Sequence, residues 1–407
     1  MLISKAARNT AARSFQASNP GRFRQATMTT RDYAITAETM RRTAEAGLGS
    51  ANWYKSPIPR AELKELMRRS DGPALRDTII WVAVLLASGV AGYFAWGTWW
   101  AVPCFAIYSV VYGGSSDSRW HEWGHGTAFK SRWLNDWGYQ IASFMVLREP
   151  TLWRWSHTRH HTDTMIVGRD PEIGVPRPPD FVGIALNVFA LKSSWIALRG
   201  VLRHAAGRLT ETEETFIPAS ERANVYREAR VWIAIFAAIV ALGIATRSFL
   251  PLMYVGPVPT ILGGWFVIFM GLTQHAGLAE DVLDHRLNAR TVYMNPVFRF
   301  LYWNMNYHVE HHMFPTVPYY ALPKLHEAMK ADTPPPYPST FAAYREIIPA
   351  LIRQRREPAW HIARPLPPNA KPFSDYEAFA NMGDMTRGRA RPAAPQGTAG
   401  APGAGAA

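Results

Sequence analysis

The sequence predicts an all-α integral membrane protein with four transmembrane helices in two hairpins and a cytosolic helical cap. Two observations lead to this fold class. Apolar stretches that can cross a bilayer lie at 78–96, 98–114, 231–246 and 252–273. Most of the 13 histidines stand in three tight clusters in the polar segments that flank these stretches. We therefore expect the cap to carry the chemistry.

The segments before and after the membrane domain differ in composition. Residues 1–35 are basic, and we expect them to be disordered; they resemble an organelle transit peptide, although a start at Met28 explains them equally well. Residues 36–77 have a charged, helical pattern and form a cytosolic N-terminal segment. The membrane domain then covers 78–330, a cytosolic C-terminal segment covers 331–387, and the Ala/Gly/Pro-rich tail 388–407 is expected to be disordered.

The four spans pair into two hairpins because their connectors, at Gly97 and near 248–251, are very short. A hydrocarbon core of about 30 Å needs about 20 apolar residues, and a bent helix can be shorter. Pro103 in the second span and Pro257 and Pro259 in the fourth can bend these helices. All long polar segments then share one face, and since they hold nearly all the Lys and Arg, that face is cytosolic. We expect the inner membrane of a bacterium.

Charge and cysteine content exclude several function classes. The net charge is +13, but the basic residues are spread over the polar segments without a nucleic-acid-binding motif, so we expect membrane lipid and no nucleic acid as a partner. Cys104 is the single cysteine. It excludes an intramolecular disulfide and any Cys-based zinc or iron–sulfur site within one chain.

The histidine clusters predict a metal centre. HEWGH holds His121 and His125, HTRHH holds His157, His160 and His161, and HVEHH holds His308, His311 and His312. Spacings of three and four residues place imidazoles on one side of a helix. Eight imidazoles are too many for one ion, so the sequence predicts two. We assign no role to His204, His285, His326 and His361, which lie outside the clusters.

HEWGH also fits HExxH, the zinc-protease signature, in which Glu122 would be the general base. A zinc site with three protein ligands would leave HTRHH and HVEHH without a function. We therefore interpret Glu122 as an acid that orients a histidine ligand, or as a solvated residue.

The order of the motifs resembles the membrane fatty acid desaturase and hydroxylase superfamily over about residues 78–330. The segment NYHVEHHMFPTVPYYALPKLH, residues 306–326, is especially similar to the third histidine box of that superfamily. The resemblance implies two non-haem iron ions held by the eight box histidines, with His275 in LTQHAG as a further ligand. Some members have an Asn one turn earlier, where this chain has Gly271.

Each histidine ligand needs an acceptor for its second ring nitrogen, and acids adjoin the boxes. The candidates are Glu122, Asp170, Glu172 and Glu310; for each, a surface or capping role is an equal alternative. The chain has no cytochrome b5, rubredoxin or flavin-binding motif. Electrons must therefore come from an external carrier, either a ferredoxin or a cytochrome b5 with its reductase.

Three functions remain open. The first is O2-dependent desaturation or hydroxylation of an unactivated C–H position in a fatty acyl or lipid substrate. The second is the same di-iron chemistry on a small polar molecule or a hydrocarbon, as in alkane hydroxylase, dihydrorhizobitoxine desaturase or rhizopine oxygenase relatives; GRDPEIGVPRP, residues 168–178, is unusual for an acyl desaturase and supports it. The third is a non-redox membrane protein such as a metal store, transporter or protease. Gly263 and Gly264 could open an acyl tunnel or serve as a helix contact.

Overall fold

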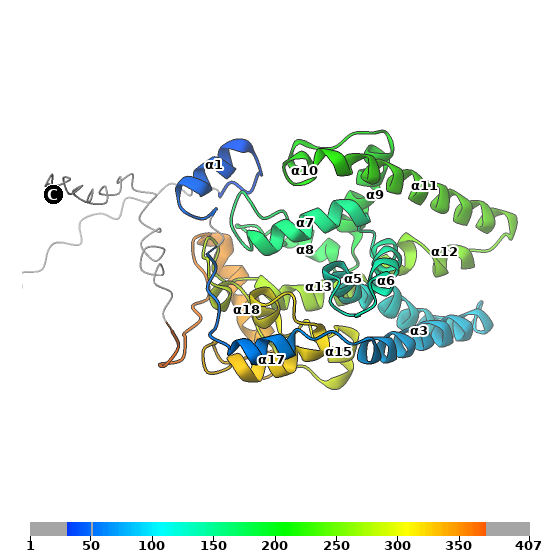
Figure 1. Ribbon diagram of the computed structural model, residues 1–407. Helices are drawn as coiled ribbons and strands as arrows, with labels where there is room; N and C mark the ends of the chain where they lie inside the picture. The colour runs from blue at the N-terminus through cyan, green and yellow to red at the C-terminus, as the bar shows by residue number, and fades with distance from the viewer. Residues whose placement is uncertain (1–30, 50–51, 372–407) are drawn as a thin grey trace, which may run out of the picture.

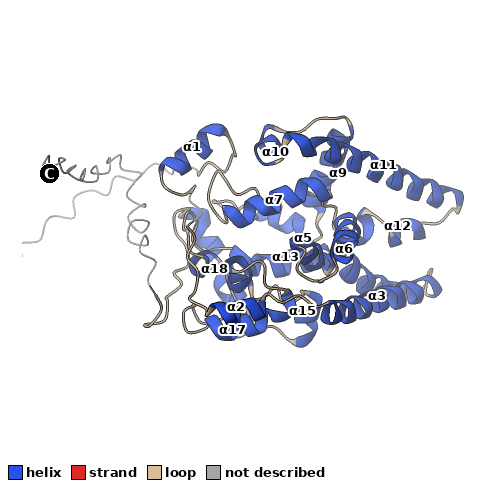
Figure 2. Ribbon diagram, viewed as in Figure 1, coloured by secondary structure: helices blue, strands red, loops and turns tan. Residues whose placement is uncertain are grey.

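The computed structural model describes residues 31–49 and 52–371, and every regular element within these ranges is a helix (Figures 1 and 2). Two isolated β-bridges, Thr291–Tyr307 and Val292–Tyr337, are the extended pairings between described residues. The fold class is therefore all-α, as the sequence predicts. Of the two segments predicted to be disordered, 1–35 and 388–407, residues 1–30 and all of 388–407 lie outside the described residues.

Long apolar helices form a stem on one side of the molecule. Its two longest helices, α3 and α11, extend in the same direction, away from the N-terminal helix (Figure 1). The chain elements of this region are α3 Asp71–Phe94, α4 Ala101–Ser109, the π-helical turn η1 Val110–Gly114, α11 Arg222–Ala245, α12 Leu250–Tyr254 and α13 Pro257–His275.

Three helical segments are long and apolar enough to cross a membrane: Arg60–Phe94, Ala219–Ala245 and Leu250–His275. A fourth candidate is the pair α8 (Phe181–Asn187) and α9 (Leu191–Ala205), which is bent by 81°. The described residues thus contain three or four candidate spans. The predicted second span, 98–114, is not among them; in this region α4 ends at Ser109 and the chain continues as the π-helical turn η1.

The sequence did not lead us to predict the bent pair, because Asn187, Lys192 and two serines interrupt its apolar run.

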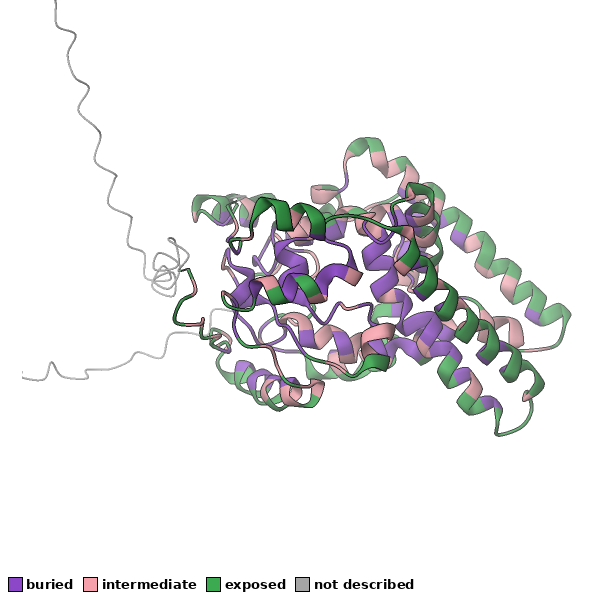
Figure 3. Ribbon diagram, turned by 60° about the horizontal axis from the view of Figure 1, so that its bottom comes forward, coloured by how far each residue is buried: buried purple, intermediate pink, exposed green. Residues whose placement is uncertain are grey.

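Elsewhere the stem helices expose apolar side chains to their surroundings, as a lipid-facing surface would. Leu86 on α3 is 62% exposed and Ile244 on α11 is 73% exposed. Figure 3 shows the buried residues gathered away from the free ends of these helices.

Shorter helices form a cap over the other end of the stem. They carry the histidine clusters and are joined by well-packed loops. Their bounds are α1 Ala37–Glu45, α2 Arg60–Leu66, α5 Ser116–His125, α6 Arg132–Met145, α7 Pro150–Thr162, α10 Glu211–Phe216, η2 Ala219–Glu221, α14 His285–Asn288, α15 Pro296–Leu301, α16 His308–Met313, η3 Tyr319–Ala321, α17 Leu322–Met329 and α18 Thr340–Arg356.

Glycines let the π-helical turn η1 pack directly against α13. A Cβ on Gly113 would lie 2.5 Å from the Cα of Thr260, and a Cβ on Gly263 would overlap the carbonyl oxygen of Ser109. Gly263 is therefore a helix contact, one of the two roles that the sequence left open. Since α5 continues from η1, this contact also fixes the first histidine cluster relative to the last stem helix.

Candidate metal centre

Nine histidines from four helices converge inside the cap. Helix α5 supplies the first cluster, α7 the second and α16 the third, while His275 is the last residue of α13. Helix α5 ends directly after His125 because Gly126 adopts a left-handed conformation (φ 66°), which favours glycine. Helix α7 begins with Pro150, which suits a first helical turn.

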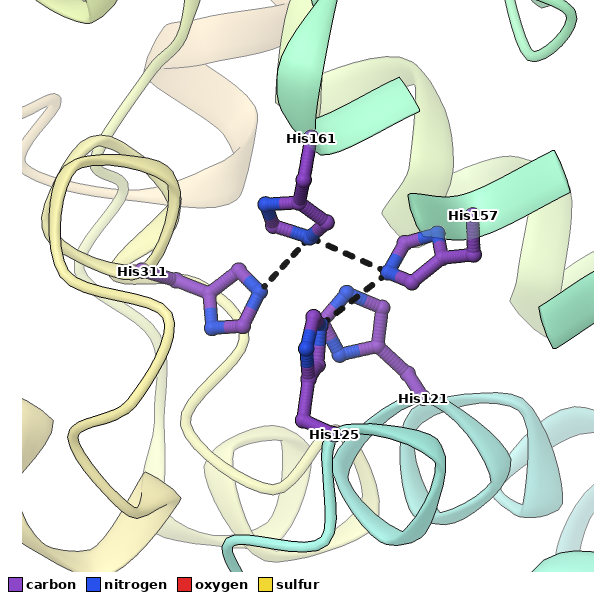
Figure 4. Close-up of side chains that lie close together, drawn as sticks. All are labelled: His121, His125, His157, His161 and His311. Carbon is purple, nitrogen blue, oxygen red and sulfur yellow. Dashed lines mark hydrogen bonds between the residues drawn. The ribbon is translucent and has the colours of Figure 1, made fainter. Parts of the chain in front are cut away.

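The first group of imidazoles contains ligand atoms that all lie within 4.8 Å of one another, in His121, His125, His157, His161 and His311. The five side chains point toward one another from three segments of the chain (Figure 4). The Nε2 atom of His157 lies 3.2 Å from that of His125 and 3.1 Å from that of His161. The Nε2 atom of His161 lies 3.3 Å from that of His311.

The second group lies beside the first. Ligand atoms of His160, His275 and His312 are within 4.8 Å of one another. His308 joins them, since its Nε2 atom is 2.9 Å from that of His275 and 3.0 Å from that of His312. The two groups are adjacent: the rings of His161 and His312 stack with centroids 4.5 Å apart.

These contacts fit two metal ions better than a hydrogen-bonded cluster. Two imidazoles at right angles on one ion, each about 2.1 Å from it, hold their nitrogens about 3 Å apart, which is close to the observed spacings. Both ring nitrogens of buried His121 lack a hydrogen-bond partner. Buried polar groups rarely remain unpaired. The residues therefore fit a pair of bound cations.

The protonation state also suits metal binding. Burial, reinforced by the other imidazoles, lowers the pKa of most box histidines well below its ordinary value, so these rings are neutral at physiological pH. The group comprises His121, His125, His161, His308, His311 and His312. A neutral ring presents the lone pair that a cation needs.

Acids from the loop after α7 hold the second cluster from outside. The Nδ1 atom of His160 donates to Asp170, with distances of 2.9 and 3.0 Å to its two oxygens, and that of His157 donates to Glu172 at 3.0 Å. Burial alone would raise the pKa of Glu172, but the adjacent His157 lowers it to about 2. The predicted candidates Asp170 and Glu172 thus lie directly behind two imidazoles.

The other two predicted acids are placed differently. Glu122 is fully buried, and its Oε1 atom lies 3.5 Å from the Nδ1 atoms of both His121 and His311. Burial raises the pKa of Glu122 to about 8. Glu310 instead accepts hydrogen bonds from His326 and Thr291, each at 2.5 Å. Glu310 therefore anchors α16, and within the described residues it makes no hydrogen bond to a box imidazole.

Comparison with known proteins agrees with this geometry. The fatty acid desaturase family profile matches residues 97–344, more than half of the chain. The chain belongs to the fatty acid desaturase family.

Two curated proteins are similar to this member of the fatty acid desaturase family. The chain is 25% identical over 229 residues to Delta(5) fatty acid desaturase fat-4 of Caenorhabditis elegans. This aligned region covers 49% of the chain and 50% of the nematode protein. The chain is 28% identical over 273 residues to Delta(12) acyl-lipid conjugase (11E,13E-forming) of Impatiens balsamina. This aligned region covers 58% of the chain and 67% of the plant protein. The match thus spans about half of the nematode protein.

Some contacts of this desaturase-family centre gave no signal in the sequence. His275 Nδ1 donates to the carbonyl oxygen of Asn288 at 2.6 Å, and the Thr164 hydroxyl lies 3.2 Å from His312 Nδ1. Both partners are distant in sequence or use the backbone, so only the fold reveals them. Gly271, one turn before His275, has open space beside it, and Gln274 donates to the Tyr302 hydroxyl.

Two of the histidines to which the sequence assigned no role contact acidic side chains instead of the box imidazoles. His204 lies between Glu149 and Glu213, at 2.7 and 3.2 Å, and His326 contacts Glu310. His285 is closer to the centre, because its ring lies 5.2 Å from that of His312 and stacks on Trp53. His361 is exposed.

A cavity of about 290 Å³ reaches this centre from the stem. Its lining includes His275, Glu172 and Gln274, and Gly264 and Gly271 of α13 form part of the wall. Gly264 also lies against Ala190 at the bend between α8 and α9. Small residues on α13 therefore keep a space open beside the histidines.

Proposed function

We propose that the chain is an O2-dependent membrane di-iron oxidoreductase that desaturates or hydroxylates an unactivated C–H position of a fatty acyl or lipid substrate. The convergence of nine imidazoles into two adjacent groups carries this proposal. Membership of the fatty acid desaturase family and the names of the two curated relatives support it. In the proposed site the ligands are the eight box histidines and His275.

Bound iron would supply the O2 activation that no side chain can provide. The protein's own residues hold and shield the site. Asp170 and Glu172 accept the Nδ1 protons of His160 and His157, which turns the Nε2 atoms of these rings inward. Nearly complete burial of His308, His311 and His312 excludes water from the reacting carbon. The cavity beside His275 would hold the substrate segment that reacts.

We place the histidine boxes on the cytosolic side of a bacterial inner membrane, in the domain 78–330. The distribution of Lys and Arg supports this orientation. We further propose that a ferredoxin or a cytochrome b5, with its reductase, docks on that side and supplies electrons. The flanking segments 36–77 and 331–387 would then lie on the same side as the carrier.

Expression with a ferredoxin and its reductase tests the proposal. Membrane lipids and polar metabolites are profiled for the wild-type chain, the variant His308→Ala and the control His361→Ala, which changes an exposed ring outside the clusters. We expect new double bonds or hydroxyl groups in acyl chains for the wild type and the control, and none for His308→Ala. Identical lipids and metabolites in all three strains would contradict the proposal.

A second candidate, the same chemistry on a small polar molecule, is favoured by one observation. The cavity beside the histidines is lined by the charged side chains of Asp117, Arg148, Glu172 and Arg177. Unchanged lipids with an altered small metabolite would select this candidate.

A further inference from the structure

An ion pair lies in the wall of the cavity that reaches the histidines. Arg148 Nη1 is 2.6 Å from Asp117 Oδ1, and both side chains are mostly buried, at 23% and 17% exposure. Both residues line the cavity together with Gly264 and Gly271 of α13. The reacting segment of a substrate in this cavity would therefore pass an acid and a guanidinium.

The pair is held in a fixed position. The Arg148 guanidinium lies over the rings of Trp120 and Trp153, 4.2 and 4.8 Å from their centroids, and such stacking stabilises a cation in a partly desolvated place. Asp117 occupies the first turn of α5. Neither side chain is a loose surface group.

The pair is also close to the candidate metal centre. Asp117 stands four residues, about 6 Å along the axis, before His121 on the same face of α5. The ring of Trp120, beneath Arg148, lies 5.4 Å from the ring of His157. A substrate group at the ion pair would thus lie in the same cavity as Glu172 and His275 of the candidate metal centre.

A plain hydrocarbon chain gains nothing from these two groups, because covering them with methylenes removes water from charges without replacing its hydrogen bonds. A group that both donates and accepts can satisfy Asp117 and Arg148 together. The charges of the pair cancel, so a neutral group suits it better than a carboxylate, which Asp117 would repel. Hydroxyl and amide groups meet all of these conditions.

We propose that Asp117 and Arg148 bind a neutral hydroxyl or amide group of the substrate, in the cavity that also borders His275. The preferred substrate is then an acyl chain, or a shorter molecule, that carries such a group. This inference rests on the proposed function and narrows its substrate class.

The test measures substrate-dependent O2 consumption by the iron-loaded protein with ferredoxin and reductase. The probes are the methyl ester of hexadecanoic acid, its derivatives with one hydroxyl at successive carbons, and the same series built on hexanoic acid. The variants are Asp117→Leu, which removes the polar group, and Asp117→Asn, which keeps a donor and an acceptor. Asp136→Asn is the matched control, because this acid is exposed on α6.

We expect the wild type and the control to prefer at least one hydroxylated probe over its unsubstituted parent. The preference should fall about 10- to 100-fold in Asp117→Leu, as expected for a lost hydrogen bond to a substrate hydroxyl, and largely return in Asp117→Asn. An ion pair that only joins α5 to the loop before α7 would lower all rates together and leave the ratio unchanged.

A wild type that prefers the unsubstituted probes would overturn the inference, and so would an Asp117→Leu variant with an unchanged ratio. The inference is also contradicted if none of the probes stimulates O2 consumption by the iron-loaded protein. That result would not contradict the presence of an iron centre. A protein without iron contradicts the proposed function instead, so the two failures are distinguishable.

Discussion

At the scale of single residues, the outward ring nitrogens set the orientation of the imidazoles. Asp170 and Glu172 face His160 and His157, so the Nε2 atoms of these rings turn toward the centre. The spacing of the histidines was enough to predict that they converge. Their outer partners Thr164 and Asn288 could not be predicted, because a hydroxyl and a backbone carbonyl far along the chain carry no motif.

Removing the outer carboxylate should weaken the centre without unfolding the chain. The Asp170 carboxylate accepts from His160 Nδ1 and from two backbone N–H groups, of Met165 and Glu172, both at 2.8 Å. Asp170→Asn keeps one acceptor oxygen and loses the charge, so we expect metal affinity or activity about 10- to 100-fold lower. Iron titration checks this, with Asp136→Asn as the control. Wild-type affinity in Asp170→Asn would contradict it.

Loss of a single central imidazole should have a larger effect. His311 belongs to the first group and is fully buried. We expect His311→Ala to lower activity more than about 100-fold, beyond the effect of an outer partner, and to reduce the bound iron. His361→Ala should retain both. Full iron content in His311→Ala, measured by elemental analysis, would remove His311 from the ligand set.

At the scale of elements, the close contact between η1 and α13 aligns the first cluster with the last stem helix. The sequence allowed two roles for Gly263 and Gly264, and only the packing distinguishes them. Gly263 touches the Ser109 carbonyl, whereas Gly264 lies against Ala190 and also borders the cavity.

Alanine variants of Gly263, which packs against backbone atoms, and of Gly271, which borders open space, test the role of close packing. A Cβ at position 263 would overlap backbone atoms, which cannot move aside as a flexible side chain can, while a Cβ at position 271 meets no atom within 4 Å. We expect Gly263→Ala to lower the free energy of unfolding by about 1–3 kcal/mol or more. Gly271→Ala should melt like the wild type. Equal thermal melting of both purified variants would show that the contact is not tight.

At the scale of the whole molecule, the candidate spans separate the histidine cap from the far ends of the stem helices. Hydropathy predicted most of this division, because long apolar helices are its direct signal. It missed the bent pair α8–α9, in which polar residues interrupt the apolar run. The described residues contain three candidate spans, or four if the bent pair forms one span.

Cysteine labelling tests the proposed orientation. In a Cys104→Ser background, we place single cysteines at Thr98 and Thr246, which are exposed at the far ends of the stem, and at Asp136 and Glu214, which are exposed in the cap. An impermeant maleimide added to intact cells should label the first two positions and spare the others. If the cap positions react in intact cells, the histidines do not face the cytosol.

The number and kind of metal ions in an active preparation test the central claim most directly. Elemental analysis of the purified full-length chain, combined with Mössbauer spectroscopy after ⁵⁷Fe enrichment, measures both. We expect about two iron ions per chain in nitrogen-rich coordination, and their loss together with activity in His311→Ala. An active preparation that contains zinc, a single iron or no metal would contradict a di-iron centre formed by the nine histidines.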